Sequence, residues 1–433
     1  MRFTYRFMKD VGAPALMWLQ AIQKRRRRKA PDPHAAPSLR SSQRLKQIMS
    51  RHYYLARFVV GVRPIAWVTS GAPVELLRAF DFYTVYPENH GALCGARRMG
   101  PDICTHAERE GYSPDLCSYA RIDLGHMLSG KTPVGRLPKP DLLFCATNIC
   151  QTVLHWFKTL SHHWQIPLVL FDLPYCFERM SHNEIAYATE QVDEIVSILE
   201  RVAGRAFSLS RYREIVAVAK ETALMWGRIL DTMKHRPAPM TTFDAFVHMA
   251  PVVTLRGLPV ALHYYRGLLR ELEERVAQGI GAVKPERKRL LWDNIAIWHT
   301  LREWPKMFAE RGYGFVAATY THAWAETIYH LDERHPVESL AMAYGPIFLN
   351  NNLEHRLALM ERLIKEYRVD GVLLHSDRSC KPYSIGQYEL KRRLTATLGV
   401  KTVIIESDMS DHRMHSEEQA KTHLAAFFDT LEN

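Results

Sequence analysis

Short apolar segments alternate with helical segments along most of the 433 residues, and this alternation restricts the fold more than any other feature. Before the middle of the chain, strands are predicted at residues 63–69, 82–86, 140–146 and 167–172. After the middle, strands are predicted at residues 288–297, 314–319, 370–375 and 401–406. Apolar strands that alternate with helices are typical of a parallel sheet covered on both faces.

A long helical region separates the two groups of strands. Residues 183–236 and 242–279 show helical character, with apolar residues such as Val192, Ile195 and Leu199 at helical spacing. The chain is also longer than one hydrophobic core usually serves. We therefore predict an α/β protein with two parallel-sheet units joined by a helical segment. The predicted parts are a helical basic arm (1–60), a first α/β unit (61–182), a helical bridge (183–285) and a second α/β unit (286–433).

The net charge of +11 arises at one end of the chain. Residues 1–51 contain 13 lysines and arginines against two acidic residues, whereas the remainder contains 44 of each sign. The run KRRRRK at 24–29 therefore marks a local arm, either a solvated tail or a contact for an acidic partner or subunit. A balanced body argues against a nucleic-acid-binding protein. No apolar run reaches the ~18 residues of a membrane span, and no cleavage pattern follows the first 30 residues, so we expect a cytoplasmic protein.

Three of the seven cysteines stand where a predicted strand ends or a helix begins. Cys150 follows strand 140–146, Cys380 follows strand 370–375, and Cys117 precedes a helical segment. A helix N-terminus favours the thiolate, which is the form that ligates iron. Spacing alone leaves three readings open: a three-cysteine metal site, a nucleophilic cysteine beside one of 21 histidines, and small buried thiols. The remaining cysteines are expected to be ordinary reduced thiols: Cys94, Cys104, Cys145 and Cys176.

Two long runs resemble a known family. The runs YPENHGALCGA (86–96) and GYSPDLCSYARIDLG (111–125) are similar to the 2-hydroxyacyl-CoA dehydratase and benzoyl-CoA reductase family. Further segments at 137–150, 378–381 and 405–408 fit the same family, so the likeness runs from about residue 63 to the end. Residues 1–60 have no counterpart in it.

The resemblance implies a fold, a cofactor and a set of site residues. Family members resemble paired subunits, each with two flavodoxin-like units and a [4Fe–4S] cluster between them. The positions that match the three cluster ligands are Cys117, Cys150 and Cys380, with Cys94 in reserve. The catalytic candidates in the matching runs are Glu88, His90 and Arg121, which could instead cap helices or build the cleft wall.

The resemblance also implies a reaction. A separate ATP-hydrolysing iron–sulfur activator would supply single electrons of low potential, which reach an acyl-CoA thioester through the cluster. Dehydratases of the family expel a 2-hydroxyl group in this way, and reductases reduce an aromatic ring. We expect a catalytic subunit paired with a homologous second subunit, in a hetero- or homodimer, and the run 117–125 slightly favours the larger, B-type subunit of benzoyl-CoA reductase. The alternatives are a double-cubane-cluster protein that reduces small molecules, and a cluster-free scaffold.

Overall fold

Each group of apolar strands forms one four-stranded parallel sheet. The first sheet has the order β2-β1-β3-β4 and the second has the order β6-β5-β7-β8. The strands of the first sheet are β1 (Ile65–Val68), β2 (Tyr83–Val85), β3 (Leu142–Ala146) and β4 (Leu168–Phe171). The strands of the second sheet are β5 (Lys288–Asp293), β6 (Tyr313–Ala318), β7 (Gly371–Asp377) and β8 (Lys401–Ser407). Counted within its own sheet, each order is 2-1-3-4, so the two units share one topology and the predicted α/β class is confirmed.

The first strand of each sheet marks a reversal of strand order. Strand β1 pairs in parallel with β2 on one side and with β3 on the other, and β5 pairs with β6 and β7 in the same manner. Helices leave the two neighbouring strands in opposite directions at such a reversal, which opens a crevice beyond the carboxyl ends of the strands. Each unit therefore offers one crevice for a ligand.

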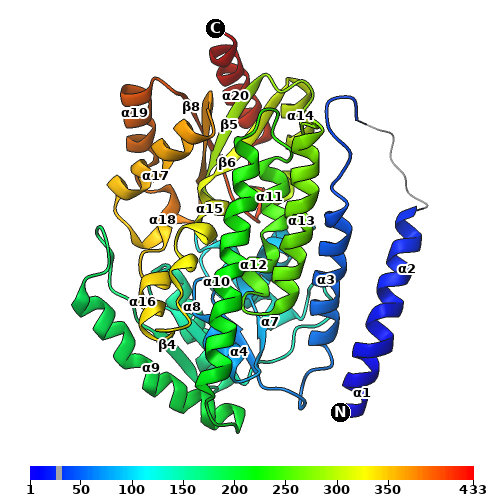
Figure 1. The fold of residues 1–433 in the computed structure, drawn as a ribbon, viewed down its shortest axis with the longest axis vertical. Helices are drawn as coiled ribbons and strands as arrows, with labels where there is room; N and C mark the ends of the chain where they lie inside the picture. Colours follow the sequence, from blue (N-terminus) through cyan, green and yellow to red (C-terminus); the bar gives the residue numbers. More distant parts are fainter. Residues whose placement is uncertain (26–31) are drawn as a thin grey trace.

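A computed structural model describes residues 1–25 and 32–433 and places the two units one above the other (Figure 1). The helices of the first unit are α4 (Val74–Ala79), α5 (Pro87–Ala96), α6 (Gly100–Arg109), α7 (Ser118–Ser129) and α8 (Gln151–Trp164). Those of the second unit are α14 (Trp304–Glu310), α15 (Thr319–Glu326), α16 (Glu338–Tyr344), α17 (Leu353–Glu366), α18 (Lys381–Ser384), α19 (Gln387–Leu398) and α20 (Glu417–Glu432).

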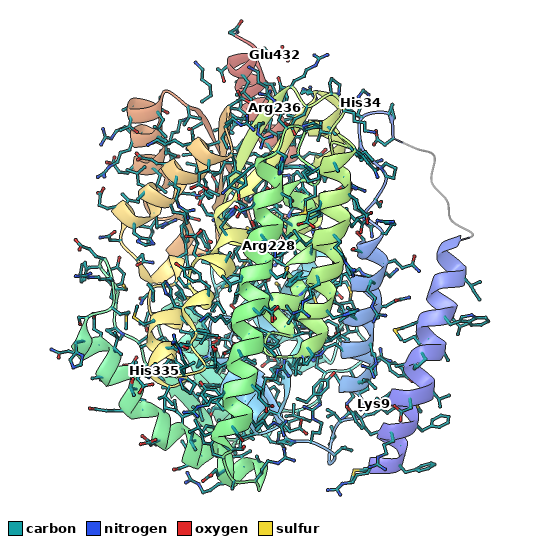
Figure 2. All side chains as sticks on the ribbon, in the orientation of Figure 1. Lys9, His34, Arg228, Arg236, His335 and Glu432 are labelled. Atoms are coloured by element: carbon teal, nitrogen blue, oxygen red, sulfur yellow. The ribbon has the colours of Figure 1, made fainter. Side chains whose placement is uncertain are left out.

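The helical middle of the chain runs alongside both units. It comprises α9 (His182–Ala203), α10 (Leu209–Asp231), α11 (Thr242–His248), α12 (Ala250–Thr254) and α13 (Pro259–Ala277). Helix α10 contacts α4 of the first unit and α15 of the second, and side chains fill the space behind it (Figure 2). The predicted helical stretch 183–236 is interrupted, because Gly204 takes a left-handed conformation (φ 59°) and the Ser208 side chain caps a new helix.

The N-terminal arm is helical, as predicted. It contains α1 (Arg2–Phe7), α2 (Ala13–Arg25) and α3 (Ser41–Ala56), and α3 packs beside α13. The carboxylate of Glu271 accepts hydrogen bonds from the Ser41 amide (2.8 Å) and hydroxyl (2.6 Å), which fixes the start of α3. Most of the basic run 24–29 lies outside the described residues, so its role stays a prediction. Within the described ranges, no helix is both long enough and apolar enough to cross a membrane.

One predicted strand is too long. Strand β5 ends at Asp293, four residues before the expected end at residue 297. Asn294 has a φ of 83°, and its side-chain oxygen accepts a hydrogen bond from the Ile295 amide (2.6 Å). Asparagine tolerates the left-handed region better than most residues, and a local turn replaces the last part of the strand.

Candidate functional site

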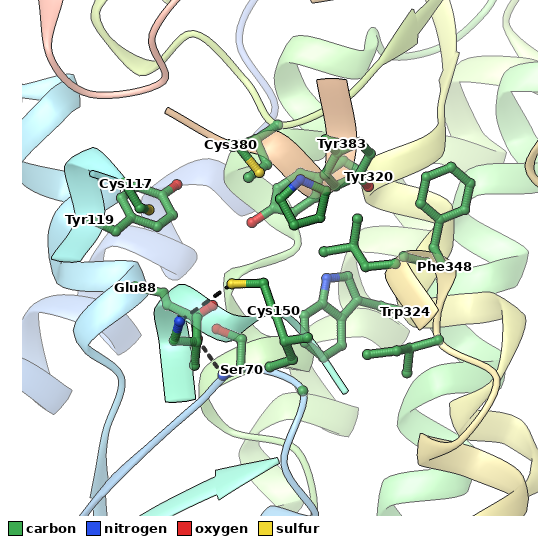
Figure 3. Close-up of a pocket in the computed structure, with 18 of the residues that line it drawn as sticks. Ser70, Glu88, Cys117, Tyr119, Cys150, Tyr320, Trp324, Phe348, Cys380 and Tyr383 are labelled. Atoms are coloured by element: carbon green, nitrogen blue, oxygen red, sulfur yellow. Dashed lines mark hydrogen bonds between the residues drawn. The ribbon is translucent and has the colours of Figure 1, made fainter. Parts of the chain in front are cut away.

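All three predicted ligand cysteines line one pocket between the carboxyl ends of the two sheets (Figure 3). Cys150 follows β3 and Cys380 follows β7, the corresponding strands of the two units. The cavity volume is about 130 Å³, roughly ten times what a cavity needs to hold one water. Its other lining residues are Ser70, Gly71, Glu88, Tyr119, Ile149, Val153, Trp156, Ile295, Tyr320, Ala323, Trp324, Thr327, Ile328, Tyr344, Ile347, Phe348, Leu349, Pro382, Tyr383 and Met409. We call it the cysteine pocket.

Each of the three cysteines is the residue that precedes a helix. Cys117 precedes α7, Cys150 precedes α8 and Cys380 precedes the short helix α18. The Val153 amide donates a hydrogen bond to the Cys150 sulfur over 3.4 Å. The amide three residues after each of the other two cysteines likewise lowers the pKa of its thiol. Three distant segments thus each place a cysteine at the start of a helix, and the three cysteines line one space.

Burial nevertheless dominates the ionisation of these thiols. It raises the pKa of Cys117 and Cys380 well above that of a free thiol, and that of Cys150 to about 11. The sulfurs also act on one another, because Cys117 and Cys150 both raise the pKa of Cys380. A bound metal cation reverses this effect, since a coordinated thiol loses its proton.

The three sulfur atoms of this structure are not all within the spacing that a single metal ion requires. Ligands of a single zinc-like ion lie at about 2.0–2.3 Å from it, so their atoms are at most about 4.6 Å apart. Within the described ranges, only Cys104, Glu108 and Asp411 place three such donor atoms within 4.8 Å of one another. Wider spacing suits a cluster in which each iron takes its own thiolate.

The cysteine pocket contains no lysine, arginine or histidine, and Glu88 is its only charged lining residue. Arg378 stands two residues before Cys380, but its guanidinium pairs with the carboxylate of Glu406 at 2.9 Å, where both side chains are half exposed. The lining of the pocket therefore offers no side chain that could compensate the charge of three thiolates.

A chain of polar contacts joins the loops of Cys117 and Cys380. The Ser379 hydroxyl accepts a hydrogen bond from the Ser118 amide (3.1 Å) and donates one to the Asp408 carboxylate (2.5 Å). Ser118 follows Cys117 in the first unit, and Ser379 precedes Cys380 in the second. One buried serine thus links the loops that carry two of the three thiols.

Replacing Ser379 with alanine is expected to loosen this link while leaving all three thiols in place. Removal of a group that supports metal ligands typically costs 10–100-fold in metal affinity. We expect iron to leave Ser379→Ala protein faster than wild-type protein during incubation with a chelator under anoxic conditions. Ser384→Ala is the matched control, because that hydroxyl donates to the Asp377 carbonyl and does not join the two units. Equal rates of iron loss in the two variants would refute the proposed link.

Comparison with known proteins identifies the family. The model of the family described as 2-hydroxyglutaryl-CoA dehydratase, D-component, matches residues 69–431. The chain belongs to this family. It is 32% identical over 369 residues to the (R)-phenyllactyl-CoA dehydratase alpha subunit of Clostridium sporogenes, covering 85% of this chain and 89% of the relative. It is 31% identical to a benzoyl-CoA reductase subunit of Thauera aromatica, over 86% of this chain and 89% of the relative. The resemblance found in the sequence is confirmed, and the chain is an enzyme of this family.

Glu88 is the predicted catalytic residue that reaches the cysteine pocket of this family member. It lies in the first turn of α5, just beyond β2, and its Oε2 accepts a hydrogen bond from the Ser70 amide. Burial raises the pKa of this carboxyl group, and the Ser70 amide and hydroxyl oppose that shift.

Arg121 lies outside the cysteine pocket. Its fully buried guanidinium binds the carboxylates of Glu108 (2.7 Å) and Asp411 (2.8 Å) and donates to the Leu116 carbonyl (2.9 Å). Arg121 therefore supports the loop before Cys117, and we do not assign it a catalytic role. These contacts also explain why the possible metal-donor atoms of Cys104, Glu108 and Asp411 lie close together. Guanidinium groups already neutralise the charges of both carboxylates.

His90 and Cys94 also lie outside the pocket. The His90 ring contacts the Thr132 hydroxyl at 2.8 Å and the Cys94 sulfur at 3.5 Å, and both residues are fully buried. Burial lowers the pKa of His90 far below that of a free histidine. The placement of His90 supports packing between α5 and α7 rather than contact with a substrate. The structure thus offers no route by which Cys94 could replace one of the three pocket thiols.

A buried carboxyl group joins the helices that begin at Cys117 and Cys150. The Trp156 ring of α8 donates a hydrogen bond to Asp123 of α7 over 2.8 Å, and the second Asp123 oxygen has no hydrogen-bond partner among the residues that the structure describes. Burial raises the pKa of Asp123 to about 7. The folded protein therefore binds this proton more tightly than the unfolded chain, whose aspartates titrate near ~3.9.

This difference in pKa between the folded and the unfolded chain predicts that the free energy of unfolding falls as the pH rises. The contribution of the protonated Asp123 side chain to the free energy of unfolding is complete below pH ~4 and is lost as the pH rises through about 7. Asp123→Asn keeps an acceptor for Trp156 and has no charge to bury, so its free energy of unfolding should exceed that of the wild type more at pH 8 than at pH 5. Urea unfolding at the two pH values measures this difference, with the exposed Asp193→Asn as control. An equal difference at both pH values would contradict the prediction.

Sequence reasoning did not anticipate two residues of the site. Tyr320 lies at the start of α15, two residues beyond β6, and points into the cysteine pocket, and Ser70 lies two residues beyond β1 (Figure 3). Both stand at the carboxyl ends of strands, which is the position where ligands bind in such sheets. Their position at the ends of strands was the one feature of the sequence from which these residues could have been predicted, because neither residue type suggests a function by itself.

Proposed function

We propose that this chain is an iron–sulfur catalytic subunit that performs radical-type chemistry on an acyl-CoA thioester. Cys117, Cys150 and Cys380 would hold a [4Fe–4S] cluster. The observation that carries the proposal is the convergence of three thiols, each at a helix N-terminus, on a pocket that has no cationic side chain in its lining. The relatives support the same chemistry, since their names are those of CoA-thioester dehydratases and a benzoyl-CoA reductase.

The donor set fits such a cluster. It consists of three thiols, spaced more widely than one ion allows and free of competing lysine, arginine or histidine side chains. A cluster bound there would supply single electrons of low potential and, with three thiolates for four irons, would leave one iron without a protein ligand. The chain itself provides a largely apolar cavity, because aromatic rings such as those of Tyr119, Tyr320 and Tyr383 form its walls. Exclusion of water protects reactive intermediates from side reactions.

Glu88 is the side chain that can exchange a proton with the substrate. Its Oε2 is held by the Ser70 amide, and the residue lines the cavity. A carboxyl group whose pKa is raised by burial keeps its proton nearer to neutral pH and can give it to a leaving hydroxyl group. Glu88→Gln would preserve the hydrogen bond to Ser70 through the amide oxygen and remove the acid.

The lining of the pocket favours an apolar acyl group. A 2-hydroxyglutaryl group carries a second carboxylate, and burying an unpaired carboxylate costs several kcal/mol. Within the pocket there is no cation to pair with it, whereas Trp156, Trp324 and Phe348 offer apolar surface. The proposed substrate is therefore an aryl, arylalkyl or branched aliphatic acyl-CoA.

We further propose the partners that such a reaction requires. The relatives are each named as one subunit of an enzyme, which supports assembly with a homologous second subunit. An ATP-hydrolysing iron–sulfur activator would supply the electron, and the complex would work in the cytoplasm.

A panel of thioesters tests the proposed function. The iron-loaded complex is incubated anoxically with its activator, ATP and either benzoyl-CoA, 2-hydroxyisocaproyl-CoA or 2-hydroxyglutaryl-CoA, and the products are analysed. We expect conversion of an apolar thioester that depends on ATP, and no conversion of 2-hydroxyglutaryl-CoA. Failure to convert any thioester by an iron-loaded complex would contradict the proposal. About eight irons per dimer in one joined cluster would favour the double-cubane alternative instead.

A further inference from the structure

A second, larger cavity lies between the N-terminal arm and the body of the protein. Its volume is about 710 Å³. One wall comes from α3, and the facing walls come from α5, α11 and α12. The lining residues are Leu16, Ser42, Leu45, Lys46, Met49, Ser50, Tyr53, Tyr54, Arg57, Asn89, Ala92, Leu93, Ala96, Arg97, Pro133, Val134, Phe246, Val247, Met249, Ala250, Val253, Trp298, Leu301 and Tyr320. We call it the arm pocket; its α3 wall lies outside residues 69–431, which match the family model.

The charges around the arm pocket have one sign. Lys46, Arg57 and Arg97 line it, all three are exposed, and no acidic side chain is among its lining residues. None of the three forms an ion pair with a described residue, although Arg57 donates a hydrogen bond to the Val134 carbonyl at 3.1 Å. Most of the remaining lining is apolar or aromatic. Such a pocket suits a ligand with an uncharged body and several negative groups.

The arm pocket adjoins the cysteine pocket. Tyr320 lines both cavities, and Glu88 and Cys380 both raise the pKa of its hydroxyl beyond the effect of burial. Tyr119 of the cysteine pocket also accepts a hydrogen bond from the ring nitrogen of Trp298, which lines the arm pocket. Aromatic side chains thus form part of the wall between the two cavities. A ligand with a narrow chain that extended from one cavity to the other would pass these rings.

We propose that the arm pocket binds the coenzyme A portion of the thioester, with Lys46, Arg57 and Arg97 contacting its phosphates. This inference rests on the proposed function, because it takes the acyl end to lie in the cysteine pocket. Coenzyme A has the required form: phosphate groups at one end, a largely uncharged pantetheine chain, and the thioester at the other end. The three cations lie on the arm side of Tyr320, and the thiols lie beyond it. A free inorganic phosphate would match the cations alone and would leave the apolar surface unused.

Charge reversal tests this assignment without turnover. Coenzyme A is titrated by calorimetry into the anoxic protein, for the wild type and for Lys46→Glu, Arg57→Glu and Arg97→Glu. Losing a charge-assisted hydrogen bond costs about 1.5–3 kcal/mol, so we expect each variant to raise the Kd about tenfold or more. Arg44→Glu is the matched control, because Arg44 is exposed on the same helix and does not line the pocket. Its Kd should stay within about twofold of the wild type, since a lone surface charge contributes little.

The outcomes separate this inference from the proposed function. The inference is overturned if the wild type binds no coenzyme A, or if the pocket variants and Arg44→Glu change the Kd equally. It is also overturned if inorganic phosphate binds as tightly as coenzyme A, because the cations alone would then explain the site. The proposed function is judged separately, by iron content and thioester conversion. Wild-type conversion together with unchanged Kd values in all four variants would reject the arm pocket alone.

Discussion

Serine in place of Cys117, Cys150 or Cys380 is expected to remove bound iron from the protein and to abolish activity with it. Supporting groups around metal ligands already contribute 10–100-fold to metal affinity, and a ligand itself contributes at least as much. We expect each variant, purified without oxygen, to hold about a tenth or less of the wild-type iron. Iron analysis and the visible absorption of the cluster measure the result.

The matched control for this experiment is Cys145→Ser. Cys145 is fully buried in β3, close in sequence to Cys150, and does not line the cysteine pocket. Its hydroxyl can keep the contact that the thiol makes with the Ala146 carbonyl. Full iron content in Cys145→Ser and its loss in the three pocket variants would support the assignment. Retention of iron and activity in any one pocket variant would remove that cysteine from the ligand set.

Glu75→Gln is expected to produce the largest loss of stability, because it leaves a buried charge without its partner. Glu75 in α4 and Arg256 after α12 are fully buried and form an ion pair at 2.8 Å. The Tyr344 hydroxyl donates to Glu75 at 2.6 Å and accepts from Arg256 at 2.8 Å. The network thus joins the first unit, the helical middle and the second unit, and Tyr344 also lines the cysteine pocket.

The expected cost is about 3–5 kcal/mol, which is typical when one partner of a buried ion pair is removed. Burial opposes the charge of Arg256, but an arginine side chain does not lose its proton in proteins, so the guanidinium stays charged in the variant. Urea unfolding of the purified chain measures the loss. Glu221→Gln is the control, because Glu221 pairs with Arg266 at 2.5 Å where both side chains are about half exposed. That pair should contribute at most about 1 kcal/mol, and equal losses in both variants would contradict the role of the buried network.

The strands were predictable because their signal is local. Six of the eight strands are buried along all or nearly all of their length, as their apolar composition suggests, whereas β4 and β8 alternate between buried and more exposed residues. Helix α5 was not predicted, because glycines lower helix propensity. The structure supplies the reason for one of them: a Cβ atom on Gly91 would lie 2.6 Å from the Tyr119 ring, so α5 and α7 can pack closely only with glycine there. Such a requirement arises from tertiary packing and is not visible in the segment itself.

The candidate site was predictable to a similar degree. Three cysteines beside helix starts, together with the family resemblance, pointed to one site, and the structure brings them into one pocket with Glu88. The ion pairs of Arg121 could not be predicted from the neighbouring sequence, because its carboxylate partners are 13 and 290 residues away along the chain. A charged residue in a functional run looks catalytic until its ion-pair partners are known. The roles of the pocket residues remain predictions that the experiments above address.

The most direct test of the central claim is the content of iron and acid-labile sulfide per chain after purification without oxygen. The account predicts about four of each, together with the brown absorption of a [4Fe–4S] cluster. Protein that is correctly folded, prepared under the same conditions and free of iron and sulfide would contradict it, and the three thiols would then be ordinary buried cysteines.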